Sequence, residues 1–415
     1  MKKDKATKQV HKDTIFQEAE KVFSKSYVKM IRDKGHGFLE QEGAGSCLID
    51  SEGNSYLDCY TSGGTFNLGR KNPAIAQRFK KAIYETDQGN FVMPSQEKAL
   101  LARRIAEFMP GSLDCVLFGV TRGESMDAAC KLVRGFTARP ELITVDGGCY
   151  GESGFALSLS ERAGKEQFGK LIQAVKIIPF GDIDAARQAI GARTAAVVME
   201  PIQVENHCRR ADALYYTQVR SFCDTTGSKL IFDETQSGFG RTGKRFFFEH
   251  VGVSPDILII GEAITSGIFP MTAMVFTPEL KGFFDIHPLI HLCTFGGHDL
   301  GCMVAMTSLD EYDRLEPWNN AARLGEKLMG DMAALVKTDK GRLVSIAGKG
   351  LLISLKFSSP DIAVSFCSKA RENGLLVNTG KVDTSTILIR PSLLVTETEL
   401  KEIVDKTSMA LSAIQ

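Results

Sequence analysis

The chain has 415 residues, more than one hydrophobic core usually holds, because single cores stop growing beyond about 250–300 residues. We therefore expect two lobes. Hydrophobic residues make up 43% and charged residues 24%, which are ordinary globular values and exclude a disordered, collagen-like or coiled-coil protein. Basic and acidic residues number 50 each, and this balance argues against a nucleic-acid binder or a protein that adheres to anionic membranes.

Targeting and redox features are few. No apolar run approaches the roughly 18 residues of a membrane span, so we expect no membrane segment. Residues 1–13 are basic but no apolar stretch follows them, which argues against a secretory signal. The ten cysteines include no CxxC pair and no cluster at zinc spacing. We therefore expect no metal site, and reduced, mostly buried thiols in a cytoplasmic protein.

The N-terminal third begins with helical and hairpin signals. Residues 14–32 carry apolar positions at helical spacing, residues 46–60 predict a β-hairpin, and residues 96–109 predict an amphipathic helix.

From residue 114 onward, short apolar strands alternate with helices. The strand-like runs span 115–120, 141–147, 195–201, 229–234 and 256–262, and a helix is expected over 124–138. This alternation predicts a parallel sheet buried on both faces. Ligands of such sheets bind outside the carboxyl ends of the strands. One shared pocket is therefore expected at the residues that end these runs: Thr121, Gly147, Glu200, Asp233 and Glu262.

The last 115 residues mix helices with short strands. Helices are expected over 305–315, 321–336, 362–373 and 397–413, and strands over 343–347, 351–357 and 375–378. This pattern predicts a smaller α+β domain.

Three motifs follow one another along the chain: MEPIQ at 199–203, LIFDETQSGFGRTG at 230–243 and TFGG at 294–297. Together they resemble class III aminotransferases of the pyridoxal-phosphate-dependent fold type I, and the resemblance runs from about Leu57 to beyond Arg390. It implies an α/β fold: a large, mostly parallel-sheet, cofactor-binding domain over 61–300, a small α+β domain over 301–415, and an N-terminal segment, 1–60, joining the small domain. It further implies pyridoxal phosphate or pyridoxamine phosphate as cofactor, and a small-molecule amino compound as ligand.

The resemblance also assigns cofactor contacts. Asp233 is similar to the family's carboxylate against the pyridine nitrogen, and Gln236 to the partner of the ring hydroxyl. Thr121-Arg122-Gly123 opens a helix and matches the phosphate loop, since a helix N-terminus presents free N–H groups. Thr294 is similar to the residue that reaches the phosphate of the neighbouring subunit, which implies a homodimer.

Three further positions have two interpretations. Where the family commonly has a stacking aromatic residue followed by His-Gly, this chain has Cys149-Tyr150-Gly151; either the aromatic has moved one place, or Tyr150 replaces the histidine and the ring is unstacked. Glu200 either contacts the site or is only a strand-end carboxylate. Arg390 is similar to an arginine that binds a substrate carboxylate, with a structural ion pair as the alternative.

The chain departs from the family at the catalytic lysine, because that position aligns with Glu262. A carboxylate cannot form the imine that holds the cofactor, so ordinary transamination should be lost or very slow. A second departure is Arg122, where the family's phosphate loop has glycine. Since both changes introduce a charge, we expect Arg122 and Glu262 to pair; the alternative is that Arg122 points to solvent or to the phosphate.

These observations leave three hypotheses open. The chain binds pyridoxal phosphate or its amine form noncovalently, together with an amino compound. Alternatively, it is a non-catalytic homologue with a closed pocket that acts as a binding or regulatory subunit. The third possibility is an inactivated variant of a working aminotransferase.

Overall fold

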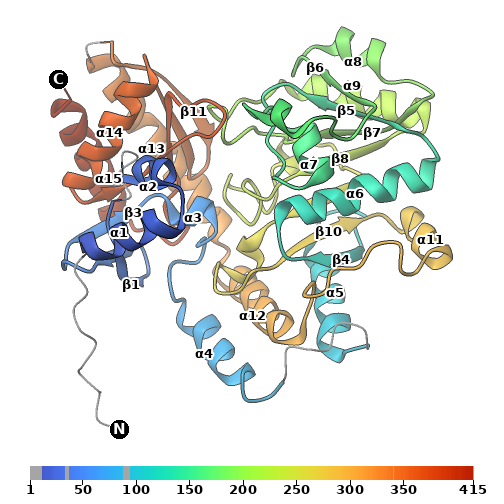
Figure 1. The fold of residues 1–415 in the computed structure, drawn as a ribbon, viewed down its shortest axis with the longest axis horizontal. Helices are drawn as coiled ribbons and strands as arrows, with labels where there is room; N and C mark the ends of the chain where they lie inside the picture. Colours follow the sequence, from blue (N-terminus) through green and yellow to red (C-terminus); the bar gives the residue numbers. More distant parts are fainter. Residues whose placement is uncertain (1–11, 33–36, 87–93, 340, 415) are drawn as a thin grey trace.

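A seven-stranded sheet forms the centre of the large lobe (Figure 1). The computed structural model describes residues 12–32, 37–86, 94–339 and 341–414. The strand order is β4-β10-β9-β8-β7-β5-β6. Neighbours from β9 to β6 pair in parallel, and β10 runs antiparallel to β4 and β9. The mostly parallel sheet expected from the apolar runs is confirmed. Its strands are β4 (Cys115–Gly119), β5 (Glu141–Val145), β6 (Val175–Ile178), β7 (Thr194–Met199), β8 (Lys229–Asp233), β9 (Ile257–Ile260) and β10 (Thr272–Phe276).

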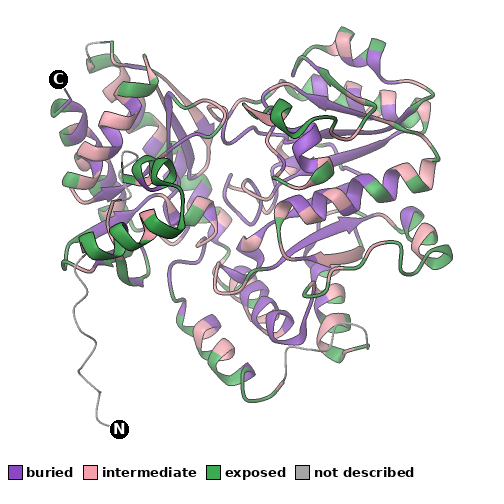
Figure 2. Cartoon of the chain, in the orientation of Figure 1, coloured by how far each residue is buried: buried purple, intermediate pink, exposed green. Residues whose placement is uncertain are grey.

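Helices cover both faces of this sheet, which explains why the central strands are continuously apolar (Figure 2). Alternate residues of one strand enter different hydrophobic clusters: Val197 and Met199 face one side, and Ala196 and Val198 face the other. The helices of this lobe are α4 (Pro73–Ala82), α5 (Gln96–Phe108), α6 (Arg122–Thr137), α7 (Gly154–Leu159), α8 (Ile183–Ala189), α9 (Ala213–Thr226), α10 (Phe248–Val251), α11 (Pro278–Ile286) and α12 (Asp299–Leu315).

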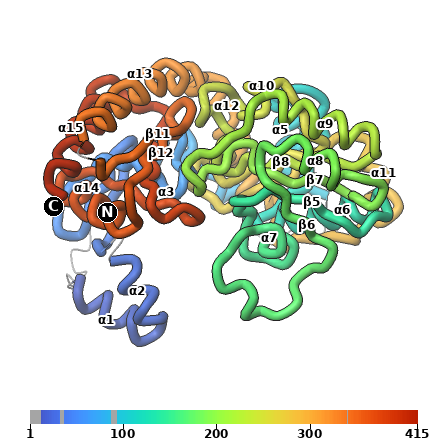
Figure 3. The backbone as a smooth tube through the Cα atoms, turned by 90° about the horizontal axis from the view of Figure 1, so that it is seen from above, coloured from blue at the N-terminus to red at the C-terminus, as the bar shows by residue number. Residues whose placement is uncertain are grey.

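The small lobe is built on an antiparallel sheet of order β11-β12-β15-β14. Its strands are β11 (Leu343–Lys349), β12 (Leu352–Phe357), β14 (Asn378–Thr379) and β15 (Thr386–Ile389), and its helices are α13 (Pro317–Thr338), α14 (Pro360–Glu372) and α15 (Glu397–Ser412). In the view from above, the two lobes lie side by side (Figure 3).

The N-terminal hairpin shares a sheet with the C-terminal region. Strands β1 (Glu40–Ala44), β2 (Cys47–Asp50) and β3 (Ser55–Asp58) are consecutive and antiparallel, and β13 (Leu375–Leu376) adds to β3 in parallel. The helix expected over 14–32 is two helices, α1 (Lys12–Val22) and α2 (Lys25–Ile31), because Ser24 caps the second by accepting the Tyr27 N–H at 3.4 Å. The proposed domain boundaries at 60 and 300 stay a prediction.

The ten cysteines are all free thiols. Across the described ranges, no helix combines the length and the apolar character needed to cross a membrane.

Candidate functional site

A cavity of about 480 Å³ lies at the carboxyl ends of the large sheet, and small-lobe residues complete its wall. From the large lobe its lining includes Thr121, Arg122, Gly123, Cys149, Thr235, Gln236 and Glu262. The C-terminal region contributes Asn378, Lys381 and Arg390. The structure thus brings most of the expected site residues to one pocket, as the rule for parallel sheets predicts.

The start of α6 sets the direction of Arg122. Thr121 caps this helix, and its hydroxyl accepts the Glu124 N–H at 3.3 Å. A side chain at position 123 would clash, because an added Cβ would lie 2.6 Å from Ser153 Oγ and 3.3 Å from Ser153 N. Position 123 therefore needs a glycine, and the neighbouring Arg122 extends its side chain to the cavity.

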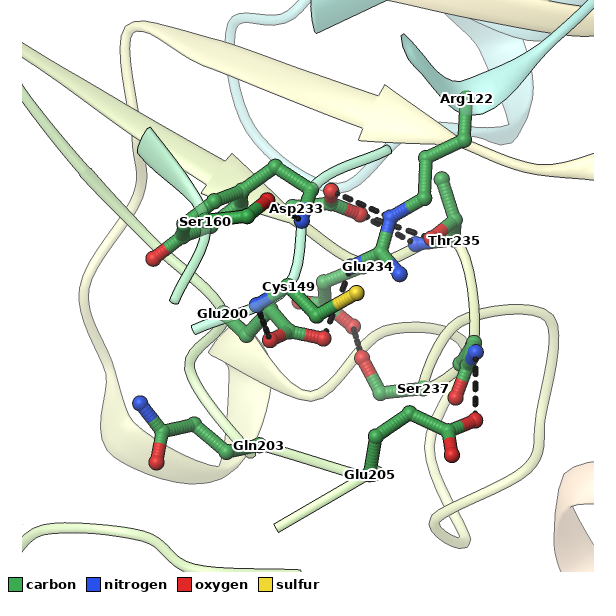
Figure 4. A network of polar contacts seen from close by, with 12 residues as sticks. Arg122, Cys149, Ser160, Glu200, Gln203, Glu205, Asp233, Glu234, Thr235 and Ser237 are labelled. Carbon is green, nitrogen blue, oxygen red and sulfur yellow. Dashed lines mark hydrogen bonds and ion pairs between the residues drawn. The ribbon is translucent and has the colours of Figure 1, made fainter. Parts of the chain in front are cut away.

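Arg122 joins two buried carboxylates, which we call the Arg122 cluster: Arg122, Asp233 and Glu200 (Figure 4). Its Nε donates to Asp233 Oδ2 and its Nη2 to Glu200 Oε1, both at 2.8 Å. The side chains of Asp233 and Glu200 are 0% and 3% exposed, and that of Arg122 is 15% exposed. Such short charge-assisted bonds are the strong kind.

The remaining oxygens of the cluster are also occupied (Figure 4). Asp233 Oδ1 accepts the Thr235 N–H at 3.1 Å and the Thr235 hydroxyl at 2.8 Å. Glu200 Oε2 accepts the Cys149 N–H at 2.9 Å. The cluster nevertheless holds two carboxylates for one guanidinium, so burial, partly offset by Arg122, raises the pKa of Glu200, and the neighbouring Asp233 adds to the rise.

The expected ion pair between Arg122 and Glu262 is wrong, because the guanidinium is used by Asp233 and Glu200. Glu262 begins η3 (Glu262–Thr265), the short helix that follows β9. Within the described residues its carboxylate forms no ion pair and no hydrogen bond with another side chain. Burial raises its pKa; its own N–H, Arg122 and Lys381 lower it in part.

Arg390 lies at the centre of a second network, the Arg390 cluster: Arg390, Glu205, Gln236 and Asn378. Its side chain is 0% exposed. Nη2 donates to Asn378 Oδ1 at 2.9 Å, and Nη1 approaches Gly63 O, Gln236 Oε1 and Glu205 Oε1 at 3.3–3.5 Å. Gln236 Nε2 donates to Glu205 Oε1 at 3.1 Å. The guanidinium is thus engaged in the structural ion pair that was the alternative for this residue.

Four expected site residues are not among the residues that line the cavity: Glu200, Asp233, Tyr150 and Thr294. Glu200 and Asp233 are connected to it through their bonds to Arg122. The Tyr150 side chain is fully buried, and its hydroxyl accepts from the Thr144 hydroxyl at 2.9 Å and donates to Val198 O at 3.4 Å. It therefore belongs to the core, which corrects the expectation that Tyr150 contacts the cofactor; Cys149 faces the cavity instead. Thr294 is exposed and lies apart from the cavity of its own chain.

Among the pocket residues that sequence reasoning missed are the charged residues Glu205 and Lys381. Glu205 follows the MEPIQ motif by two residues, and that proximity was the available signal. Lys381 lies in the loop after β14, where the pattern gave no signal of a site.

Comparison with known proteins identifies the family. The class III aminotransferase profile matches residues 31–411. The chain belongs to the class III aminotransferases. An uncharacterized aminotransferase from Archaeoglobus fulgidus is 34% identical over 377 residues, covering 91% of this chain and 89% of that protein.

Solved structures of transaminases share the fold. The ornithine aminotransferase of Toxoplasma gondii has a TM-score of 0.90 and 23% identity, covering 98% of this chain and 95% of its own. An amine transaminase from an uncultivated Pseudomonas species, in its pyridoxal-phosphate-bound internal aldimine form, has a TM-score of 0.84 and 23% identity over 91% and 95%. The expected fold type I architecture is therefore confirmed.

Membership of the class III aminotransferases implies pyridoxal phosphate as the cofactor. Part of this pocket suits it: the first residues of α6 and Gln236 line the cavity. The position expected to face the pyridine nitrogen does not fit it, because Asp233 accepts one bond from Arg122 and two from Thr235. A pyridine N–H would have to compete with Arg122 for Asp233, since the guanidinium bonds to Oδ2.

Proposed function

We propose that this class III aminotransferase does not carry out ordinary transamination and instead binds a small amino compound without forming an imine. The observation that carries the proposal is the engagement of Asp233 by Arg122, together with the carboxylate of Glu262 where the family has its lysine. A carboxylate lacks the amine that forms an imine with an aldehyde. Arg122 must release Asp233 before the pocket holds pyridoxal phosphate or pyridoxamine phosphate. No covalent bond would then retain the cofactor.

The electrostatics of the pocket support this proposal. Removing the guanidinium from between Asp233 and Glu200 exposes two buried carboxylates to one another, which is strongly unfavourable. A cofactor ring supplies one N–H to Asp233 and nothing to Glu200. Displacement of Arg122 is therefore opposed by the cluster itself.

The test is a titration with pyridoxal phosphate, followed by borohydride reduction and intact mass measurement. We expect no mass gain for the native chain. We expect the double variant Arg122→Gly/Glu262→Lys to gain one cofactor mass, mapped to position 262, because it restores the family's residues at both places. Arg122→Gly/Glu326→Lys is the matched control, since Glu326 is an exposed residue of α13, and it should gain nothing.

Two outcomes contradict the proposal. A covalent mass gain on a lysine of the native chain would show that another amine has taken over the imine. If the double variant keeps the native circular dichroism spectrum but gains no cofactor mass, position 262 does not correspond to the family's lysine.

We also propose a cytoplasmic homodimer. Five apolar side chains near Thr294 are more than half exposed, as expected of a surface that another subunit covers: Ile286, Leu289, Ile290, Leu292 and Phe295. Light scattering at micromolar concentration should give twice the monomer mass, and a monomeric mass would contradict the dimer.

A further inference from the structure

Arg241 is a fully buried arginine of the large lobe that bonds to both lobes. It lies in the loop between β8 and α10 and is 0% exposed. Nη1 donates to Leu351 O at 3.0 Å and to Pro391 O at 2.6 Å, and Nη2 donates to Asn67 Oδ1 at 2.6 Å. Leu351 lies in the turn between β11 and β12, and Pro391 follows β15, so both belong to the small lobe, whereas Asn67 precedes α4 of the large lobe. One guanidinium therefore ties three separate segments together.

The charge of Arg241 is unfavourable in this position. Among the residues that the structure describes, no carboxylate pairs with it, and its Nε has no hydrogen-bond partner. Burial lowers the pKa of Arg241, and the cationic Arg390 lowers it further. A buried charge that lacks an ion partner is a poor source of stability, because its loss of hydration is not offset. Stability alone therefore does not explain an arginine at this position.

The backbones of the two lobes approach closely around Arg241. The Leu351 N–H donates to Arg241 O at 3.1 Å, which adds a main-chain bond to those of the side chain. The neighbouring Gly350 has a φ of +59°, and a Cβ added there would lie only 2.5 Å from a backbone carbon of the Arg241 loop. On the large-lobe side, Phe239 has a φ of +54°, a strained conformation for a residue with a side chain, and its buried ring stacks with Phe108. The surroundings thus determine the position of Arg241 closely.

The small-lobe partners of Arg241 adjoin the wall of the cavity. Pro391 directly follows Arg390, which lines the cavity together with Asn378 and Lys381. A guanidinium holds its nitrogens in one plane at fixed separations, so it sets the relative positions of its acceptors more strictly than a lysine ammonium would. The bonds of Arg241 therefore determine where the small-lobe wall stands relative to the large lobe.

We propose that Arg241 is a positioning residue that fixes the small lobe against the large lobe and thereby sets the small-lobe wall of the cavity. Arg241 is not among the residues that line the cavity, and it acts through Leu351 and Pro391. Without its bonds, the lobes should separate transiently and the cavity should open to solvent. Since the arrangement of the lobes does not depend on imine formation, this role is independent of the proposed function.

The first test is the rate at which iodoacetamide labels Cys149, which lines the cavity together with residues of the small lobe. Arg241→Met keeps a long side chain but removes the three bonds, and we expect it to speed the labelling of Cys149 at least fivefold, measured by peptide mass spectrometry. Cys130, buried in α6 of the large lobe, is the internal control and should not change. Arg220→Met is the matched control variant, because Arg220 forms its ion pairs within the large lobe, and it should leave Cys149 unchanged.

Hydrogen exchange separates a positioning role from a general loss of stability. The amides of Leu351 and Leu393 donate to Arg241 O and Asn67 O, at the junction of the lobes, and we expect them to exchange at least tenfold faster in Arg241→Met. The amides of Ile231 and Leu355 lie inside the large and the small sheet, and they should change less than twofold. A merely structural role would speed the exchange of all four amides together.

A second variant covers the case in which Arg241→Met does not fold. Arg241→Lys keeps the charge, but its single nitrogen cannot replace the two-nitrogen fork, so it should speed both the labelling of Cys149 and the exchange at the lobe junction twofold or more. Unchanged labelling of Cys149 in a folded variant overturns the proposal, and so does an equal rise in exchange at all four amides. If neither variant keeps the native circular dichroism spectrum, Arg241 is required for folding itself, which also overturns the proposal.

Discussion

Arg122 and Arg390 are both buried at the cavity, but they are held in different ways. Arg122 makes two bonds of 2.8 Å to two carboxylates that have little or no exposure to solvent. Arg390 shares one carboxylate at 3.5 Å and relies mainly on amide and carbonyl oxygens. The first cluster is a concentrated charge network at the expected cofactor position, whereas the second is a looser polar frame between the lobes.

Arg122 bonds to a residue that is expected to contact the cofactor, whereas Arg390 supports the wall of the cavity. Asp233 is the residue that the family resemblance assigns to the cofactor ring, and Arg122 bonds to one of its oxygens. Arg390 does not occupy an acceptor that is expected to contact the cofactor. Its carboxylate partner, Glu205, also accepts hydrogen bonds from Gln236 and from the Lys381 N–H.

The Arg122 cluster should be the more sensitive to loss of its cation. Arg122→Ala leaves two buried carboxylates unpaired, and we expect it to lower the free energy of unfolding by about 3–5 kcal/mol. Urea denaturation measures this, with Arg103→Ala, at an exposed arginine of α5, as the control. A loss below about 1 kcal/mol would contradict the tight coupling of the cluster.

Arg390→Gln should cost less, about 2 kcal/mol, because Glu205 still accepts from Gln236 and from the Lys381 N–H. The same urea measurement applies. If this variant were less stable than Arg122→Ala, the contrast between the two clusters would be reversed.

The two clusters should also respond to pH in opposite directions. Burial raises the pKa of Glu200, so the folded chain binds the proton that the unfolded chain has lost, and stability falls as pH rises above the ordinary glutamate pKa of about 4.3. Burial acts to raise the pKa of Glu205, but the charges of Arg390 and Lys381 and the hydrogen bonds from Gln236 and the Lys381 N–H together lower it. The contribution of Glu205 to stability is therefore present above that pH and is lost as pH falls below it.

Urea unfolding of the native chain, Glu200→Gln and Glu205→Gln between pH 4 and 8 measures these trends. Because the pKa of Glu200 is raised to about 7, the native chain should lose about 3 kcal/mol relative to Glu200→Gln on going from pH 4 to pH 8. Relative to Glu205→Gln, its advantage should be constant above about pH 5 and shrink toward pH 4. Parallel curves for both comparisons would contradict the assigned pKa directions.

The smallest effect is expected at Lys381. Because its ammonium has no bonded partner among the described residues, Lys381→Gln should change the free energy of unfolding by less than about 0.5 kcal/mol. A larger loss in the same denaturation assay would mean that this lysine supports the fold.

Much of the fold could be predicted from the sequence, because continuous apolar strands between helices define a buried parallel sheet. The gathering of Thr121 and Glu262 at one cavity, with Asp233 bonded to the cavity residue Arg122, follows from the geometry of such sheets. The partner of Arg122 could not be predicted, because a long side chain reaches several acceptors and the sequence does not show which carboxylate is nearer. The prediction for Tyr150 was wrong for a similar reason, because the sequence does not show which way a side chain points. The Tyr150 side chain is buried in the core, where its hydroxyl bonds to Thr144.

The proposed function requires that Arg122 compete with the cofactor ring for Asp233. Equilibrium dialysis of pyridoxal phosphate against the native chain and against folded Arg122→Gly measures this competition, with Arg103→Ala as the control. We expect Arg122→Gly to bind pyridoxal phosphate at least tenfold more tightly than the native chain. Equal affinity, or tighter binding by the native chain, would contradict it.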